Sequence, residues 1–152
     1  MAYIQWQDDF ATGINVIDSQ HKRIIHYINQ LSDAQNLNEA ELIGDVLINL
    51  VDYTLSHFAF EESLMDDVGY HAALIHKNTH DSFRNKIISY KERYADGENI
   101  SEELSQLLNI WLIDHIQDDD GSYVPVVKEK VPTINGAETQ SWIKHKIQQF
   151  FK

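Results

Sequence analysis

Five histidines and a glutamate occupy positions where a helical reading of the chain would place apolar side chains. His57 and Glu61 are four residues apart, as are His76 and His80, so each pair projects from one face of an α-helix. Either pair alone is a weak signal, because a single histidine in a core is usually satisfied by a hydrogen bond. Together the six residues predict a metal centre built from neutral imidazoles and carboxylates. They are His21, His57, Glu61, His76, His80 and His115.

The number of these ligands favours two metal ions over one. Each unpaired polar group buried in a core costs about 1–3 kcal/mol of folding free energy. The six side chains therefore need a common binding partner that offsets this cost. One tetrahedral zinc takes four ligands, whereas two octahedral irons can use five imidazoles and two bridging carboxylates, with an oxygen bridge and one open position. Ferritin-like proteins carry Glu-x-x-His pairs, and the sequence has none. The residues therefore favour a dinuclear iron site of another kind.

Four helices are expected to position these ligands. Both prolines, Pro125 and Pro132, lie late in the chain, so residues 1–124 contain nothing that forbids continuous helix. A non-helical arm of about 17 residues comes first. Four helical patterns follow, separated by capping and helix-breaking residues near positions 18, 36–38, 69, 97 and 121. This layout predicts an all-α fold, an antiparallel up-down four-helix bundle with an N-terminal non-helical arm and an appended C-terminal helix.

Each predicted helix carries part of the ligand set on its apolar stripe. The first begins with Asp18 as N-cap, the second at Asn38 with Glu41 as a capping box, the third after Gly69, and the fourth near Ser101. The fourth runs toward residue 121. The second stripe shows the pattern best: Leu42, Val46, Leu50, Tyr53, His57, Glu61 and Met65.

The segment after Pro125 differs from the rest. Residues 126–132 are interpreted as a connector and residues 142–151 as an amphipathic helix, so residues 1–124 form the bundle and 125–152 the appended part. Ile143, Ile147 and Phe151 share one face, with Lys144 and Lys146 outside it. We expect this helix to dock on its own bundle, with dimerisation through the same face as the alternative.

The composition and charge of the chain argue against several classes of function. Twelve Lys and Arg against 24 Asp and Glu give a net charge of −12, which disfavours nucleic acid and membrane surfaces as partners. Without cysteine, disulfides, iron–sulfur clusters and thiolate zinc sites are excluded. No apolar run approaches the length of a membrane span, and the first residues lack a signal-peptide pattern, so we expect a cytoplasmic location.

The motifs resemble those of the hemerythrin family, and within it the single-domain bacterial members. The resemblance covers roughly residues 4–124 and rests on Asp18-x-x-His21, His57-Phe58-Ala59-Phe60-Glu61-Glu62, His76-x-x-x-His80 and Trp111-Leu112-x-x-His115-Ile116-x-x-x-Asp120-x-x-Tyr123. It implies reversible O2 binding at a non-haem di-iron centre. The cofactors would be two iron ions, Fe2+ or Fe3+, with an oxo or hydroxo bridge, and O2 as ligand.

The resemblance also assigns the ligands. His76, His80 and His115 would hold one iron, His21 and His57 the other, and Glu61 and Asp120 would bridge both. The open position would lie on the iron of His21 and His57. Three apolar residues resemble the lining of the family's O2 pocket, for which ordinary core packing is an equal alternative. They are Phe58, Leu112 and Ile116.

The position of Asp120 matches the family motif, but in a regular α-helix it would not lie on the same face as His115. It follows His115 by five residues and so lies about 140° off its face, whereas Asp119 lies closer to it. We side with the family and predict a π-type turn between His115 and Asp120. The other histidines match no ligand position and are expected on the surface or satisfied locally. They are His26, His71 and His145.

The leading hypothesis is therefore a protein that binds O2 for storage, delivery or sensing, and not an enzyme. The first alternative is a di-iron oxidase or peroxidase, which the full ligand set disfavours. The second is an oxygen-sensing signalling module. O2 is the expected partner, and an oxygen-consuming enzyme is a possible protein partner that no residue identifies.

Overall fold

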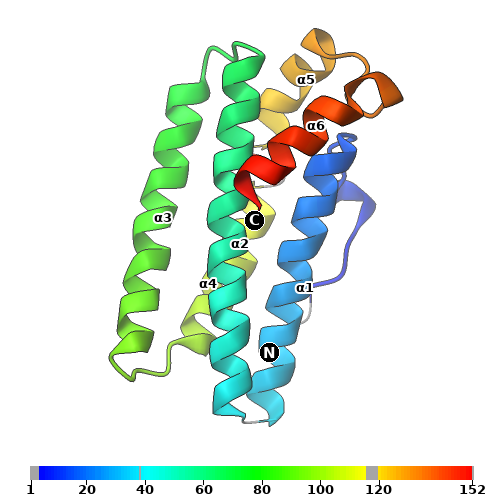
Figure 1. The fold of residues 1–152 in the computed structure, drawn as a ribbon. Helices are drawn as coiled ribbons and strands as arrows, with labels where there is room; N and C mark the ends of the chain where they lie inside the picture. The colour runs from blue at the N-terminus through cyan, green and yellow to red at the C-terminus, as the bar shows by residue number, and fades with distance from the viewer. Residues whose placement is uncertain (1–3, 38, 116–119, 152) are drawn as a thin grey trace.

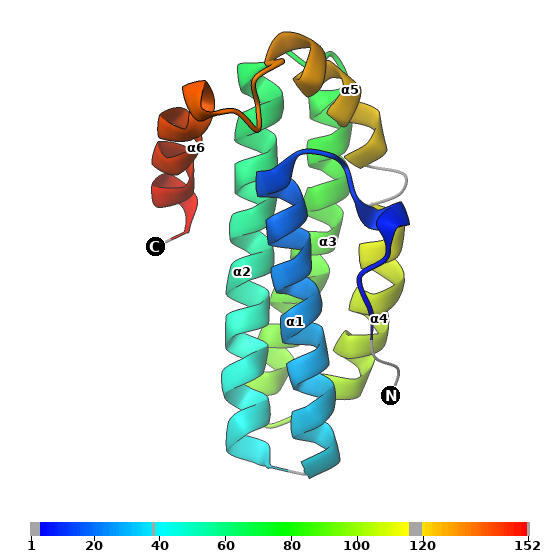
Figure 2. The same cartoon turned by 90° about the vertical axis from the view of Figure 1, so that its right-hand side faces the viewer.

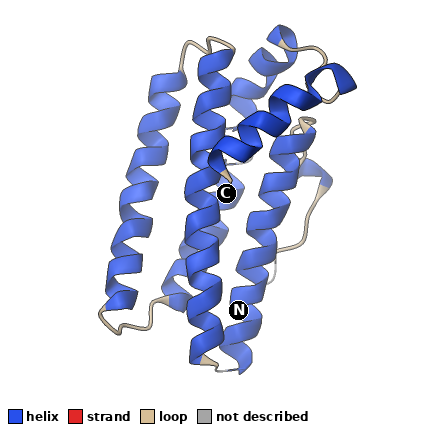
Figure 3. Ribbon diagram, in the orientation of Figure 1, coloured by secondary structure: helices blue, strands red, loops and turns tan. Residues whose placement is uncertain are grey.

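The structure is a computed structural model that describes residues 4–37, 39–115 and 120–151. None of these residues forms a strand (Figure 3). A short 3-10 turn, η1, precedes six helices. The elements are η1 Asp8–Phe10, α1 Asn15–Leu37, α2 Ala40–Asp67, α3 Ala73–Ala95, α4 Ser101–Asp114, α5 Asp120–Lys130 and α6 Ala137–Phe150.

Helices α1 to α4 form the predicted antiparallel bundle. Successive helices run in opposite directions and are joined at alternate ends (Figure 1). The N-terminal arm is attached to α1, because Ile4 and the side chain of Asn29 exchange two hydrogen bonds of 3.0 and 2.9 Å. No helix among the described residues is long and apolar enough to cross a membrane. The predicted all-α bundle is confirmed.

Helix α1 begins three residues before the predicted start. Asp18 is not its N-cap but lies in its first turn, where the carboxylate accepts hydrogen bonds from the backbone and hydroxyl of Thr12 at 2.8 and 2.7 Å. It also accepts one from the backbone of Gly13, whose φ of 84° suits glycine. The acid therefore organises the turn that leads into the helix. The second predicted cap, Asn38, lies outside the described residues, and α2 begins at Ala40.

The region around Pro125 is helical, which corrects the prediction of a connector from residue 126. Helix α5 contains Pro125 and continues to Lys130. Tyr123, Val124 and Val127 are buried in a second apolar cluster at one end of the bundle, separate from the larger core between α1 and α4. Burial of this face offsets the backbone hydrogen bond that a proline removes.

Helix α6 docks on the bundle as predicted, crossing α2 and α1 obliquely (Figures 1 and 2). Ile143 is buried, and the ring of Phe151 lies 4.9 Å from that of Tyr53. Lys146 was predicted to lie outside the docking stripe, but it is only 5% exposed. Its ammonium group donates to Ser63 at 2.6 Å and pairs with Asp67 at 2.7 Å, so it bonds α6 to α2. Leu42, placed on the inner stripe of α2, is exposed.

Candidate metal centre

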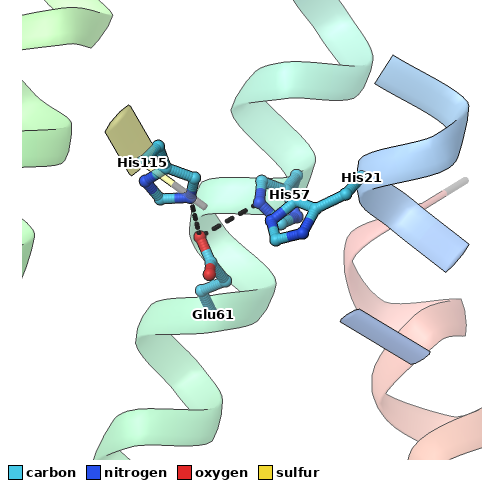
Figure 4. Close-up of side chains that lie close together, drawn as sticks. All are labelled: His21, His57, Glu61 and His115. Atoms are coloured by element: carbon cyan, nitrogen blue, oxygen red, sulfur yellow. Dashed lines mark hydrogen bonds and ion pairs between the residues drawn. The ribbon is translucent and has the colours of Figure 1, made fainter. Parts of the chain in front are cut away.

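All six residues first singled out by spacing come together inside the bundle. His21 comes from α1, His57 and Glu61 from α2, and His115 follows the end of α4 (Figure 4). His76 and His80 come from α3. Five of the six side chains are fully buried, and His76 is 7% exposed. The helical periodicity therefore predicted the positions of these side chains correctly.

The six side chains form two groups that share two members. One group consists of His21, His57, Glu61 and His115, and the other of Glu61, His76, His80 and His115. Within each group, one donor atom per residue lies within 4.8 Å of all the others. A metal ion needs its donors about 2.0–2.2 Å from itself, hence within roughly 4.5 Å of one another. Each group is thus close to the size of one metal site.

Glu61 is the centre of this arrangement. Its Oε1 lies 2.9 Å from Nε2 of His115, 3.1 Å from Nε2 of His57 and 3.4 Å from Nε2 of His80. The other oxygen, Oε2, accepts a hydrogen bond of 2.7 Å from the hydroxyl of Tyr123 in α5. Three imidazoles from different helices therefore converge on one carboxylate oxygen, and a buried phenol orients the other.

The hydrogen-bond partners of His57 and His80 determine which nitrogen of each ring carries the proton and which nitrogen faces Glu61. Nδ1 of His57 donates to Oε1 of Gln20 at 2.7 Å, and Nδ1 of His80 donates to Oε2 of Glu62 at 3.0 Å. In these neutral tautomers Nε2 carries a lone pair. Both lone pairs face the anionic Oε1 of Glu61, and neither nitrogen has a hydrogen bond within the described chain. A cation between them removes this repulsion, so the residues fit a bound metal.

Arg84 supports the hydrogen bond between Glu62 and His80. It donates to Oε2 of Glu62 and, at 2.6 Å, to Asp81. Burial alone would raise the pKa of Glu62, but the hydrogen bonds from His80 and Arg84 lower it below its usual value. Glu62 is therefore an anion that keeps the proton of His80 on Nδ1. A carboxylate behind a histidine ligand also raises the basicity of the ring.

Burial sets the charge state of the other groups. It lowers the pKa of His21 well below 6.5, and the neighbouring His57 lowers it further. The pKa of His57 is also lowered, foremost by burial. Burial by itself would raise the pKa of Glu61, but the positive charge that His57 and His115 carry when they are protonated lowers it well below its ordinary value. Near neutral pH His21 and His57 are therefore neutral imidazoles beside an ionised carboxylate, the form in which such groups bind metals.

Part of the predicted site lies outside the described residues. The backbone takes π-helical geometry at His115, where the predicted widening begins. Residues 116–119, with Ile116 and Asp119, are outside the described chain, as is the side chain of Asp120, whose backbone begins α5. Of the apolar residues assigned to an O2 pocket, Phe58 is fully buried and stacks on His80 with ring centroids 4.1 Å apart, and Leu112 is 1% exposed. His26, His71 and His145 are exposed and away from the cluster.

Comparison with known proteins agrees with the geometry. Residues 12–127 match the family model of the hemerythrin HHE cation binding domain. The chain belongs to the hemerythrin family. It is 45% identical over 152 residues to a bacteriohemerythrin of Pseudomonas aeruginosa, with 99% of both chains covered. A bacteriohemerythrin of Stenotrophomonas maltophilia is 42% identical over 153 residues, again with 99% of both covered.

Solved structures support the same family fold. A wild-type hemerythrin crystal structure aligns with a TM-score of 0.78 and 29% identity, covering 83% of this chain and 98% of the other.

The sequence did not predict the supporting roles of Gln20, Glu62 and Tyr123. Gln20 could have been found, because it lies three residues after Ile17 and four before Ile24, both fully buried. A polar residue on an apolar stripe is a signal of a buried hydrogen bond.

Proposed function

We propose that this hemerythrin binds O2 reversibly at a non-haem di-iron centre. The observation that carries the proposal is the pair of buried donor groups that share Glu61 and His115. Two adjacent sites joined by a carboxylate are the arrangement that a dinuclear centre needs, whereas a single zinc would use only one of them.

The proposed ligands follow the family assignment. His76, His80 and His115 hold one iron and His21 and His57 the other. Glu61 and Asp120 would bridge the two, and the contacts of Glu61 with imidazoles of both groups support its part in this assignment. When bound, the two irons supply the electrons with which O2 is held and released.

The residues around the ligands have separate tasks in this proposal. Gln20 and Glu62 hold protons on Nδ1 of His57 and His80, so that Nε2 of each ring is free for metal. Tyr123 fixes the orientation of Glu61. Phe58, Leu112 and Ile116 are proposed to line the O2 pocket and exclude water, which supports reversible binding over oxidation of other molecules.

The test records the absorption spectrum of the protein through a cycle of reduction, air and vacuum. Purified protein is analysed for metals, reduced without oxygen, exposed to air, and then placed under vacuum. We expect about two irons per chain, a new absorption band in air and its disappearance under vacuum. A single zinc per chain, or bleaching that vacuum does not reverse, would contradict the proposal.

A further inference from the structure

A cleft of about 700 Å³ lies between α6 and the bundle, outside the metal centre. Its size is typical of sites for small organic ligands. One wall is polar and comes from α1 and α2, with Ser19, Gln20, Arg23 and Tyr53. The opposite wall comes from α6 and its end, with the apolar Ile143, Ile147 and Phe151 and the polar Gln140. Figure 2 shows α6 standing off the bundle along this side.

Arg23 gives the cleft a positive charge. The chain has three arginines; Arg84 pairs with Glu62 and Asp81, and Arg93 with Glu98 and Glu103. Within the described part of the chain, Arg23 has no carboxylate partner and only lies over the ring of Tyr27, 5.0 Å from its centre. None of the described residues that line the cleft is acidic. An unpaired cation in a chain with twice as many acids as bases favours an anionic ligand.

Two uncharged donors accompany Arg23. Gln20 is only 4% exposed, and its Nε2 has no hydrogen-bond partner among the described residues. A buried amide N–H group without a partner costs free energy unless a ligand or water satisfies it. Burial raises the pKa of Tyr53 to about 12, so its hydroxyl keeps its proton at neutral pH. The polar wall therefore offers donors and a cation, which are what a carboxylate requires.

We propose that this cleft binds a small organic acid with an apolar chain. The carboxylate lies at Arg23, with Gln20 and Tyr53 beside it, and the apolar chain packs on Ile147 and Phe151 of the α6 wall.

The cleft also contacts the metal centre through one residue. Gln20 lines the cleft, and its Oε1 accepts the hydrogen bond from His57. A ligand that bonds the amide of Gln20 shifts the strength of that hydrogen bond and so the basicity of His57. This coupling rests on the proposed function, whereas binding of the acid does not.

Calorimetric titration of the iron-loaded protein tests the site, with octanoate as probe and 1-octanol as its uncharged counterpart. We expect one octanoate per chain and binding of octanol at least about 10-fold weaker. Arg23→Gln should weaken octanoate binding by about 10–100-fold, since it removes a charge-assisted contact. Arg93→Gln, the matched control on α3, should bind as the wild type does. Ile147→Asp should prevent binding, because it places an anion on the wall where the apolar chain packs.

Equal affinity for octanoate and octanol would overturn the proposal, as would unchanged binding in Arg23→Gln. Absorption of the iron centre tests the coupling separately. Octanoate should shift the bands in the wild type and not in Ile147→Asp. Acetate has the carboxylate without the chain, so an equal shift with acetate would show direct binding to iron and overturn the coupling. Octanoate binding in protein that fails to bind O2 would contradict the proposed function alone.

Discussion

At the scale of single residues, hydrogen bonds from Gln20, Glu62 and Tyr123 orient the side chains of the candidate metal centre. Imidazoles at apolar positions stand out in a helical pattern, which is why His57 and His80 were found from spacing. Gln20 stands out only as a polar residue on an apolar stripe. The partners of Gln20 and Glu62 lie on other helices, and spacing along one helix does not contain that information. Asp120 was assigned by resemblance alone and remains a prediction.

Glu61 provides the first residue-scale prediction. Glu61→Ala removes the carboxylate that both donor groups share, so the iron content should fall from about two per chain to one or less. Asp66→Ala, an exposed acid on the same helix, is the control and should keep full iron. Metal analysis of the folded variants gives the answer. Full iron loading in Glu61→Ala would mean that the shared carboxylate is wrongly assigned.

Tyr123 provides the second residue-scale prediction. Tyr123→Phe removes the hydroxyl that donates to the buried carboxylate of Glu61, so the free energy of unfolding of the metal-free protein should fall by about 1.5–3 kcal/mol. Tyr90→Phe is the matched control, since no hydrogen bond involves its hydroxyl in the described chain. Denaturant titration measures both. Equal stability of the two variants would show that the bond to Glu61 contributes nothing.

At the scale of elements, the sequence predicted the bundle helices better than their ends. Long apolar periodicity placed the starts of α2 and α4 within about two residues and the start of α3 within about four, because burial of one face determines such helices. Pro125 misled the prediction. Its effect on an isolated helix is unfavourable, but Tyr123 and Val127 of α5 are buried together, and only the folded chain shows that packing.

The ion pair of Lys146 gives a prediction for α6. Asp67→Ala should lower the free energy of unfolding by about 1–3 kcal/mol, because the buried ammonium group keeps only Ser63 as partner. Lys146→Met should be nearly neutral, since an apolar side chain of similar length fills the same space. Asp66→Ala is the exposed neighbour and control. A larger loss in Lys146→Met than in Asp67→Ala would contradict this account.

At the scale of the whole molecule, the buried histidines make stability depend on pH. The pKa values of His21 and His57 lie below 6.5 in the folded chain, so the unfolded chain binds more protons as the pH falls past 6.5. Stability of the metal-free protein is therefore full above this pH and should decrease below it. Denaturant titrations at pH 7.5, 6.5 and 5.5 measure the trend. His21→Gln should flatten it and His26→Gln should not; a flat wild-type profile would contradict the burial argument.

The most direct measurement of the central claim is the amount of O2 taken up by the reduced protein relative to its iron. The proposed pair of irons sharing Glu61 would act as one binding unit, so we expect about one O2 for every two irons, recovered as gas over repeated cycles of air and vacuum. The result that would contradict the account is one metal ion per chain, or O2 that is consumed and not returned.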